Sequence, residues 1–524
     1  MPRKSDPFKI LHLSDTHISS YSRFISEKFL KAVKQINRLK VDYLIHTGDV
    51  TEEGTKEDYE LVKKLLSKIE KDVIYIIGNH DARNVGYELF EEYLGPKSQV
   101  IVDDDVLIAS FDTTIPDRDG GRFGATSLKK LKKILGREGE GRTKIVAFHH
   151  HLLPMPKAGR ERSMIVDAGD VLTVILDYNV DLVLNGHRHT PNSYKIEDTM
   201  VVNSGTISNY KTRAGEGHSF NLIEFTPRKT IEIKVFNVKG TEWRRTTENL
   251  ERGDRLVKAD GDRIAKIVQI SDTHFVDSSE FLPKTYLLAV QRINQLNPDL
   301  VVHCGDVTHD GLPRSFDRAN TNLKRINSPQ LILPGPHDLM HLGHILFKEK
   351  IGKFNPVVRG NNFVVHGVNS SQYDEMNGRV GRTLLHRLIQ KISEGKEDCV
   401  EIVALHHHLL PLPHTREKYP IEDAGDVLKQ LLEHKVDMIL TGHRHVSYSQ
   451  KIAETVVVNA NTLSSRRFQA RYCNTFNLID ILSNGTAVVS EIAVITGMRR
   501  ILGIYKLPTL SQSSNLPKSH YSRC

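Results

Sequence analysis

The sequence IHTGDVT at residues 45–51 decides the fold, because residues 302–308 repeat it almost unchanged as VHCGDVT. The two segments lie 257 residues apart (302 − 45 = 257). An apolar run that ends in Gly-Asp is typical of a buried strand with a polar side chain at its carboxyl end. Two such units at a fixed separation predict two copies of one domain in a single chain.

Four more motifs accompany this one in both halves of the chain. Three keep the same separation: LSDTH, GNHD and HHHLLP begin at residues 13, 78 and 149, and ISDTH, GPHD and HHHLLP begin at residues 270, 335 and 406. The last motif, GHRH, begins at residues 186 and 442, one residue closer (442 − 186 = 256). This order predicts a first domain at 1–238, a polar linker at 239–263, a second domain at 264–504 and a disordered tail at 505–524.

Each copy alternates short apolar runs with amphipathic segments. In the first copy, expected strands at 8–13, 43–46 and 73–77 are separated by expected helices near 23–39 and 56–69. That order is typical of a largely parallel sheet covered by helices. Later apolar runs, at 100–102, 106–111, 145–148, 182–184, 220–225 and 231–236, indicate a second and more antiparallel sheet. We therefore expect an α/β domain, a two-sheet sandwich flanked by helices, duplicated in tandem.

Composition narrows the classes of function. No stretch of the sequence approaches the roughly 18 consecutive apolar residues that a membrane-spanning helix needs. The chain also begins without an apolar signal segment, so a cytoplasmic protein with no membrane partner is expected. Lys and Arg (72) exceed Asp and Glu (64) by only eight, which suits an anionic substrate but does not favour nucleic acid. The four cysteines show no Cys-x-x-Cys spacing, so any metal would use nitrogen and oxygen ligands.

Seven candidate ligands follow the apolar runs of the first copy. The carboxyl ends of parallel strands meet at one edge of a sheet, so these side chains are expected to converge. Seven nitrogen and oxygen donors exceed what one cation takes from a protein, whereas two cations that share one carboxylate use them fully. Asp49 is the expected bridge. The candidates are Asp15, His17, Asp49, Asn79, His149, His187 and His189.

The five motifs in this order resemble those of the calcineurin-like metallophosphoesterases, and the resemblance covers nearly the whole chain twice. It implies two divalent or trivalent cations, Mn, Fe or Zn, in each complete site. These would lower the pKa of a bridging water, deliver hydroxide to phosphorus and neutralise the phosphoryl oxygens. One cation would be held by Asp15, His17, Asp49 and His189, and the other by Asp49, Asn79, His149 and His187.

Neighbouring residues receive other roles. His80 is expected to protonate the departing oxygen or to stabilise the transition state, with Asp81 beside it to fix its tautomer or charge. His150 and His151 are left open between lining the substrate pocket and packing behind the ligands. Arg188 is expected to be a spacer that faces solvent.

The second copy departs from the pattern at one position. Pro336 stands where the first copy has Asn79, and proline has no side-chain oxygen to offer a cation. The replacement ligand is left open between water, a backbone carbonyl and His341. The auxiliary pair recurs as His337 and Asp338. The remaining candidate ligands, expected to hold metal more weakly, are Asp272, His274, Asp306, His406, His443 and His445.

Within the family, the HHHLLP segment and the domain length are most similar to class III cyclic-nucleotide phosphodiesterases and glycerophosphodiesterases. The resemblance implies hydrolysis of small phosphodiesters, with 3',5'-cyclic AMP as the leading substrate. The alternative is a metal-dependent nuclease resembling the DNA-repair exonucleases, with the second domain as a non-catalytic scaffold. Because domains of this family often pair as dimers, the two copies are expected to form an intrachain pseudo-dimer.

Overall fold

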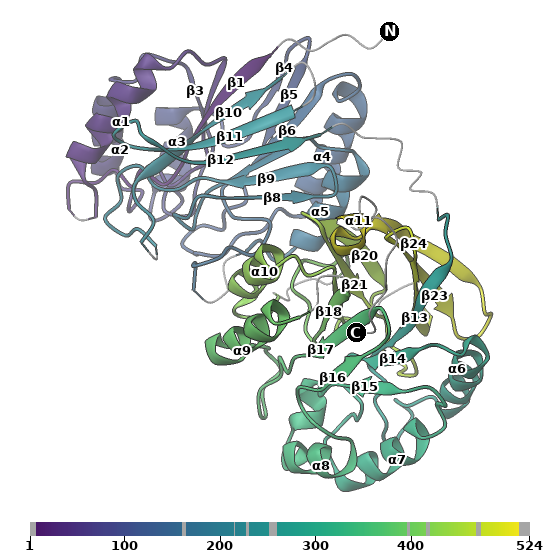
Figure 1. Cartoon of the computed structure of the whole chain (residues 1–524). Helices are drawn as coiled ribbons and strands as arrows, with labels where there is room; N and C mark the ends of the chain where they lie inside the picture. The colour runs from purple at the N-terminus through teal and green to yellow at the C-terminus, as the bar shows by residue number, and fades with distance from the viewer. Residues whose placement is uncertain are drawn as a thin grey trace. The chain divides into compact units, whose positions relative to one another are not determined.

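The chain divides into two compact units with a boundary between residues 253 and 254. Each unit is one copy of the repeat. The computed structural model describes residues 7–512 except 22, 160–163, 214, 227–229, 251–258, 396–398, 415–419 and 468–472. Figure 1 follows the chain from the purple first copy to the green and yellow second copy.

The first copy contains two six-stranded layers. One sheet has the order β12-β11-β10-β1-β2-β3, in which β1, β2 and β3 are parallel and the other neighbours are antiparallel. The other layer has the order β8-β9-β7-β6-β5-β4, with β5, β6, β7 and β9 parallel. The strands of the first sheet are β1 (Phe8–Leu13), β2 (Tyr43–His46), β3 (Val73–Tyr75), β10 (Ser219–Phe225), β11 (Thr230–Asn237) and β12 (Glu242–Asn249). Those of the second are β4 (Val100–Val102), β5 (Val106–Ser110), β6 (Thr143–Ala147), β7 (Leu182–Asn185), β8 (Asn192–Ile196) and β9 (Thr199–Asn203).

The core of the first copy lies between these layers. Ile10 and Ile45 of the first sheet meet Ile145 and Leu184 of the second in one buried cluster. Burying each such side chain stabilises the fold by about 1.5–3 kcal/mol, so the interlayer cluster holds the two sheets together. The predicted two-sheet sandwich is therefore confirmed.

The membership of the sheets needs correction, because the runs at 220–225 and 231–236, expected in the second sheet, form β10 and β11 and extend the first sheet from β1. The second sheet is the more parallel of the two.

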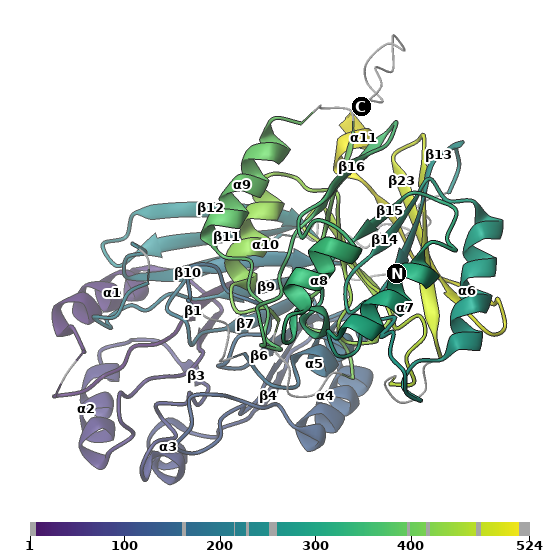
Figure 2. The ribbon, with the colours of Figure 1, turned by 90° about the horizontal axis from the view of Figure 1, so that it is seen from below.

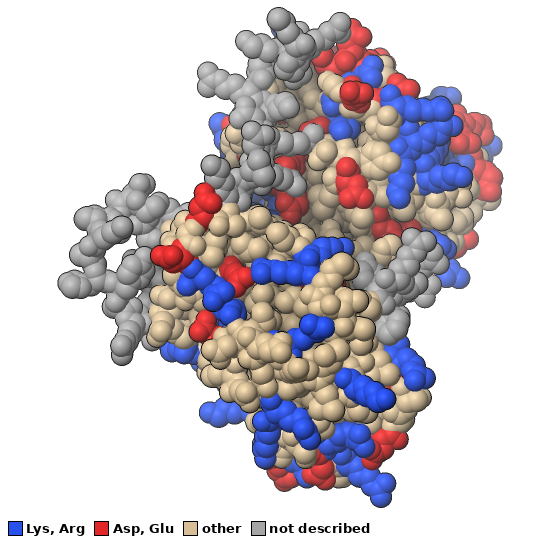
Figure 3. Space-filling model, turned by 90° about the vertical axis from the view of Figure 1, so that its right-hand side faces the viewer, with Lys and Arg blue, Asp and Glu red and all other residues tan. Residues whose placement is uncertain are grey.

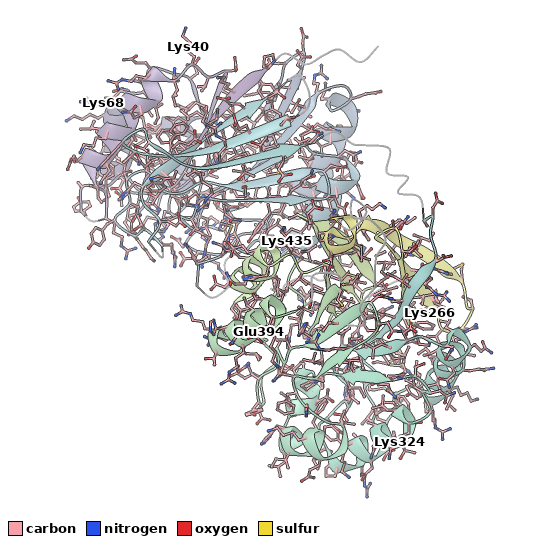
Figure 4. The ribbon with its side chains drawn as sticks, in the orientation of Figure 1. Lys40, Lys68, Lys266, Lys324, Glu394 and Lys435 are labelled. Carbon is pink, nitrogen blue, oxygen red and sulfur yellow. The ribbon has the colours of Figure 1, made fainter. Side chains whose placement is uncertain are left out.

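Helices cover the outer faces. Phe29 of α1 and Val62 of α2 pack with Leu11 and Leu44 on the side of the first sheet away from the interlayer core. α1, α2 and α3 group beside this sheet (Figure 2), and α4 packs on β5 and α5. Lys40 and Lys68, directly after α1 and α2, mark the exposed edge of this helical layer (Figure 4). The helices are α1 (Ser26–Arg38), α2 (Lys56–Leu66), α3 (Gly86–Leu94), α4 (Ala125–Glu138) and α5 (Ala168–Asp177).

The second copy repeats this arrangement strand for strand. Its sheets have the orders β15-β14-β13-β22-β23-β24 and β16-β17-β18-β19-β21-β20. The first sheet comprises β13 (Arg263–Ile270), β14 (Leu300–His303), β15 (Gln330–Ile332), β22 (Thr475–Leu482), β23 (Thr486–Ala493) and β24 (Arg499–Lys506). The second comprises β16 (Val357–Arg359), β17 (Phe363–Gly367), β18 (Val400–Ala404), β19 (Met438–Thr441), β20 (Tyr448–Ile452) and β21 (Thr455–Asn459). The helices are α6 (Pro283–Leu296), α7 (Pro313–Leu323), η1 (Pro336–Leu339), α8 (Gly343–Lys350), α9 (Arg382–Ser393), α10 (Ala424–Glu433) and α11 (Pro508–Gln512).

Two predicted boundaries need correction. The range 239–263, predicted as a linker, contains strand β12, which pairs with β11 and completes the first sheet. β12 has the sequence EWRRTTEN, and because most of its side chains are exposed it lacks the apolar run that marks a buried strand. The range 505–524, predicted as a disordered tail, contains the end of β24 and the short helix α11. Residues 251–258 and 513–524 lie outside the described residues.

Candidate dinuclear metal centre

The seven candidate ligands of the first copy converge at one edge of the two sheets. Asp15 follows β1, Asp49 follows β2, His149 follows β6 and His187 follows β7, each within three residues of the end of its strand. All seven side chains are largely buried. The prediction that the strand ends bring these residues together therefore agrees with the structure.

The backbone is strained at these positions. Asp15, His17, Asp49, His187 and His189 all have positive φ, between 50° and 74°. A residue other than glycine pays about 1–3 kcal/mol to stay in a sparsely populated region of this kind, and such strain gathers at functional sites. Their counterparts in the second copy have positive φ as well. Both copies thus retain the same strained frame for the ligands.

One group of donors is formed by Asp15, His17 and His189. The Nε2 atoms of His17 and His189 lie 3.0 Å apart, and His189 Nε2 lies 3.3 Å from Asp15 Oδ1. The donor atoms of this trio lie within 4.8 Å of one another, which is compact enough to surround one cation.

The second group is formed by Asn79, His149 and His187. Asn79 Oδ1 lies 3.0 Å from His149 Nε2 and 2.9 Å from His187 Nδ1. Asp49 lies between the two groups, because its Oδ2 is 3.6 Å from His17 Nε2 and 3.2 Å from His149 Nε2. A ligand at that position can reach both groups, and the bridging role of Asp49 stays a prediction.

Backbone carbonyls and one carboxylate orient the ligand rings. The Nδ1–H of His149 donates to Thr47 O at 2.6 Å, and that of His189 donates to Lys211 O at 2.7 Å. Each bond fixes the tautomer that leaves Nε2 free to bind a cation. Gly48 allows this packing, because it has φ 92° and an added Cβ would lie 2.7 Å from His149 Nδ1.

Glu52 faces the outer nitrogen of His17 as an ion-pair partner, and it was not among the predicted site residues. Its Oε2 lies 2.8 Å from His17 Nδ1. Burial alone would lower the pKa of His17, but the carboxylates of Asp15 and Glu52 raise it to about 10. The only signal in the sequence was the position of Glu52, three residues after Asp49. The structure adds that Glu52 is almost fully buried.

His80 lies beside the centre, but Asp81 does not act on it as predicted. His80 N donates to Asp49 Oδ1 at 2.8 Å, and its Nδ1–H donates to Glu52 O at 2.7 Å, so a carbonyl fixes the tautomer. The Asp81 carboxylate instead accepts from Thr51 N at 2.7 Å and Gly78 N at 2.9 Å. Burial raises the pKa of Asp81 to about 6. Asp81 therefore braces the two loops that carry Asp49 and Asn79.

Two other neighbours can now be placed. His150 has both ring nitrogens near protein groups, Thr113 Oγ1 at 2.8 Å and Asp119 O at 3.2 Å, which favours packing behind the ligands over contact with substrate. Arg188 does not face solvent as predicted: it is buried, and its guanidinium donates to Ala158 O. The charge of Arg188 thus lies inside the wall of the site.

The second copy assembles its six candidate ligands in the same frame. His445 Nε2 lies 3.1 Å from Asp272 Oδ1, His406 Nε2 lies 3.4 Å from Asp306 Oδ2, and the Nε2 atoms of His274 and His445 lie 3.3 Å apart. His443 Nδ1 lies 3.1 Å from His406 Nε2. Asp338 repeats the bracing role of Asp81 by accepting from Thr308 N at 2.6 Å and Gly335 N at 2.9 Å.

Pro336 removes a donor atom from the second copy but leaves the backbone hydrogen bonds of its loop in place. His337 N still donates to Asp306 Oδ1 at 3.0 Å, and its Nδ1–H still donates to the carbonyl of residue 309 at 2.6 Å. The amide oxygen that links two histidines in the first copy is missing, and His341 is exposed. Seven donors fit two cations in the first copy, whereas the second copy lacks one ligand of the second cation.

A second difference was also missed in the sequence. His309 occupies the position of Glu52, and its Nδ1 lies 3.4 Å from His274 Nδ1. Without the carboxylate, burial dominates and lowers the pKa of His274 to about 4, although Asp272 and Asp306 oppose it. Homologous histidines of the two copies thus have pKa values shifted in opposite directions.

The model of the calcineurin-like phosphoesterase family matches this chain twice, over residues 8–191 and 265–447. The chain belongs to that family. The tandem duplication and the predicted enzyme class, a phosphoric ester hydrolase, are thereby confirmed, and the family uses dinuclear metal sites. The two matched ranges contain every candidate ligand named above.

Several curated relatives carry phosphodiesterase names. A probable cyclic nucleotide phosphodiesterase of Xenorhabdus bovienii is 23% identical over 248 residues, covering 44% of this chain and all of the relative. A 3',5'-cyclic adenosine monophosphate phosphodiesterase of Haemophilus influenzae is 24% identical, covering 34% of this chain and 69% of the relative. A probable glycerophosphodiester phosphodiesterase of Arcobacter nitrofigilis is 33% identical, covering 29% and 59%. The predicted similarity to cyclic-nucleotide phosphodiesterases is confirmed. Among the described residues, every helix is too short or too polar to cross a membrane.

Proposed function

We propose that the first copy hydrolyses small phosphodiesters at a dinuclear metal centre, with 3',5'-cyclic AMP as the leading substrate. The observation that carries this proposal is the position of Asp49 between two donor groups. In each group one histidine, His189 or His149, donates its Nδ1–H to a backbone carbonyl and directs Nε2 to the centre. The names of the relatives support a diester substrate.

The seven ligands fall into two sets, one for each cation. Asp15, His17, Asp49 and His189 would hold one cation, and Asp49, Asn79, His149 and His187 the other. When bound, two cations of the Mn, Fe or Zn class activate a water for attack on phosphorus and neutralise the phosphoryl oxygens. Glu52 and the carbonyls of Thr47 and Lys211 keep the ligand rings oriented while the charge on phosphorus changes.

His80 is proposed to serve the leaving group. Its Nδ1–H is committed to Glu52 O, so Nε2 is the nitrogen that can reach substrate. The protonated ring can then donate from Nε2 to the departing oxygen. Asp49, whose Oδ1 accepts from His80 N, holds the ring and the cations in a fixed relation.

The alternative hypothesis is a metal-dependent nuclease. On the face shown in Figure 3, basic side chains gather in one patch at the upper right and are otherwise scattered among acidic and uncharged surface. The basic excess of the whole chain is only eight charges, which does not favour nucleic acid. The test compares cyclic AMP, bis-(p-nitrophenyl) phosphate, p-nitrophenyl phosphate and linear duplex DNA under one metal condition, with Asp49→Asn as the control for contaminating activity. Faster cleavage of the two diesters supports the proposal, and rapid degradation of DNA replaces it with the nuclease.

The second copy is proposed to act as a non-catalytic scaffold that pairs with the first copy as an intrachain pseudo-dimer. Its preserved sheets and its incomplete ligand set support a structural role. Small-angle X-ray scattering of the full chain tests the pairing, because two independent units would give a broad distribution of distances. The cytoplasmic location stays a prediction.

A further inference from the structure

Three histidines of the second copy form a group that the phosphoesterase site does not use as a unit. The ring nitrogens of His274, His309 and His337 that face one another lie within 4.8 Å. The closest pair, His274 Nδ1 and His309 Nδ1, is 3.4 Å apart. Two imidazoles bound to one tetrahedral zinc at about 2.0–2.1 Å would place their nitrogens about 3.3–3.4 Å apart. The spacing of this pair therefore suits a shared cation.

The first copy shows why this group is new. There, Glu52 lies 2.8 Å from His17 Nδ1, so that nitrogen carries the proton and only Nε2 is available to a metal. In the second copy His309 replaces the carboxylate, so His274 Nδ1 faces another nitrogen. On the other side of the ring, His274 Nε2 faces His445 Nε2 at 3.3 Å and, farther away, Asp272 Oδ1 at 3.7 Å and Asp306 Oδ2 at 3.8 Å. The proton on His274 can thus sit at Nε2 and leave Nδ1 as a donor to metal.

His337 completes the group. Its Nδ1–H donates to His309 O at 2.6 Å, which leaves Nε2 with a free lone pair. The rings of His309 and His337 are nearly parallel, with centroids 5.2 Å apart, and the ring of His337 lies 4.9 Å from that of His274. His309 and His337 are half-buried, so water can reach the position between them.

We propose that the second copy binds one late first-row divalent cation, such as Zn²⁺, Co²⁺ or Cu²⁺, through His274, His309 and His337. The ligand atoms are His274 Nδ1, His309 Nδ1 and His337 Nε2, with water in the fourth position. Imidazole nitrogen suits these cations better than Mg²⁺ or Ca²⁺. His445 Nε2 then accepts from the His274 Nε2–H group on the side of the ring opposite the cation, and the carboxylates of Asp272 and Asp306 lie close behind it. This binding does not depend on the hydrolysis proposed for the first copy.

The test uses the full chain with Asp49→Asn, Asn79→Pro and His189→Ala, which remove a ligand from each donor group of the first copy. In this background His309→Gln removes a proposed ligand, whereas Asp306→Asn removes a ligand of the ordinary family site. We expect His309→Gln to weaken Zn²⁺ binding more than about 100-fold, because it removes a ligand. Asp306→Asn should weaken binding by about 10- to 100-fold at most, because it removes only an outer partner of His274. Calorimetric titration with Zn²⁺ measures both values.

Paramagnetic resonance of bound Cu²⁺ gives an independent readout, because nitrogen ligands split the copper signal. The background chain should show three nitrogens and His309→Gln two. His309→Glu supplies a second variant that restores the residue of the first copy and should also show one nitrogen fewer. Full retention of Zn²⁺ affinity in His309→Gln overturns the proposal, as does loss of binding in Asp306→Asn while His309→Gln retains it. Near-ultraviolet circular dichroism confirms that each variant is folded.

Discussion

The loops around Asn79 and Pro336 hold the same backbone contacts but present different chemistry. In both, the histidine after the variable residue donates its N–H to the shared aspartate, and the next aspartate accepts from the preceding glycine. Only the first loop offers an amide oxygen to two histidines. Two loops can therefore keep the same backbone geometry and still offer different metal-binding atoms. The two copies can differ in function while they share one fold.

The largest loss of activity is expected when the proline of the second copy's loop is placed in the first copy. Asn79→Pro should lower kcat for bis-(p-nitrophenyl) phosphate by about 10³-fold or more, because one cation loses a ligand and the phosphoryl oxygens lose its charge. The second copy already accommodates proline in the same loop, so the variant should fold. Steady-state kinetics and metal analysis measure the result; turnover near that of the unmodified chain would show that the amide is dispensable.

His80 and His337 form a matched pair with a smaller expected effect. His80→Ala should lower kcat about 10²-fold at unchanged metal content, because proton transfer to the departing oxygen is lost while the ligands stay in place. His337→Ala should leave kcat nearly unchanged. Loss of metal from the first copy in His80→Ala would instead make His80 a ligand.

Glu52 provides a test of ring orientation. Glu52→Gln should weaken metal binding in the first copy about 10- to 100-fold, because His17 loses the carboxylate that fixes its Nδ1 proton. Turnover at saturating metal should fall much less than metal affinity. Titration of the metal-free chain with Mn²⁺ or Zn²⁺ checks this. An unchanged affinity would show that Glu52 does not support the binding of metal by His17.

The smallest difference is expected between Asp81 and Asp338, where the copies agree. Each carboxylate is buried and accepts backbone N–H groups from the two loops that it braces. Asp→Asn at either position should destabilise its own copy by about 1–3 kcal/mol, because an amide nitrogen faces a backbone donor. Urea unfolding followed separately for each copy measures the two values, and a clear inequality would show that the braces are not equivalent.

Much of the site was predictable because its residues follow strands in repeated motifs. Asp15, Asp49 and His149 stand directly after apolar runs, so the pattern fixes both their type and their place. Glu52 and His309 were missed because they differ between the copies and resemble ordinary loop residues. Their importance comes from the ring nitrogens they face, which only the folded chain reveals.

The remaining errors have similar causes. Strand β12 has no apolar run because most of its side chains are exposed, so its polar sequence looked like a linker. Arg188 sits between two ligands, and its burial depends on the Ala158 carbonyl, thirty residues away in the chain. Asp81 is adjacent to His80 in sequence, but its side chain points to Thr51 and Gly78. Sequence adjacency does not determine where a side chain is directed.

The most direct test compares Asp49→Asn with Asp306→Asn in the full chain, assayed with the same phosphodiester at saturating metal. Both aspartates occupy the bridging position of their copy and receive the same histidine N–H, so the substitutions are matched. The account predicts that Asp49→Asn nearly eliminates turnover and that Asp306→Asn changes it less than about threefold. Equal losses from the two variants would contradict the assignment of catalysis to the first copy.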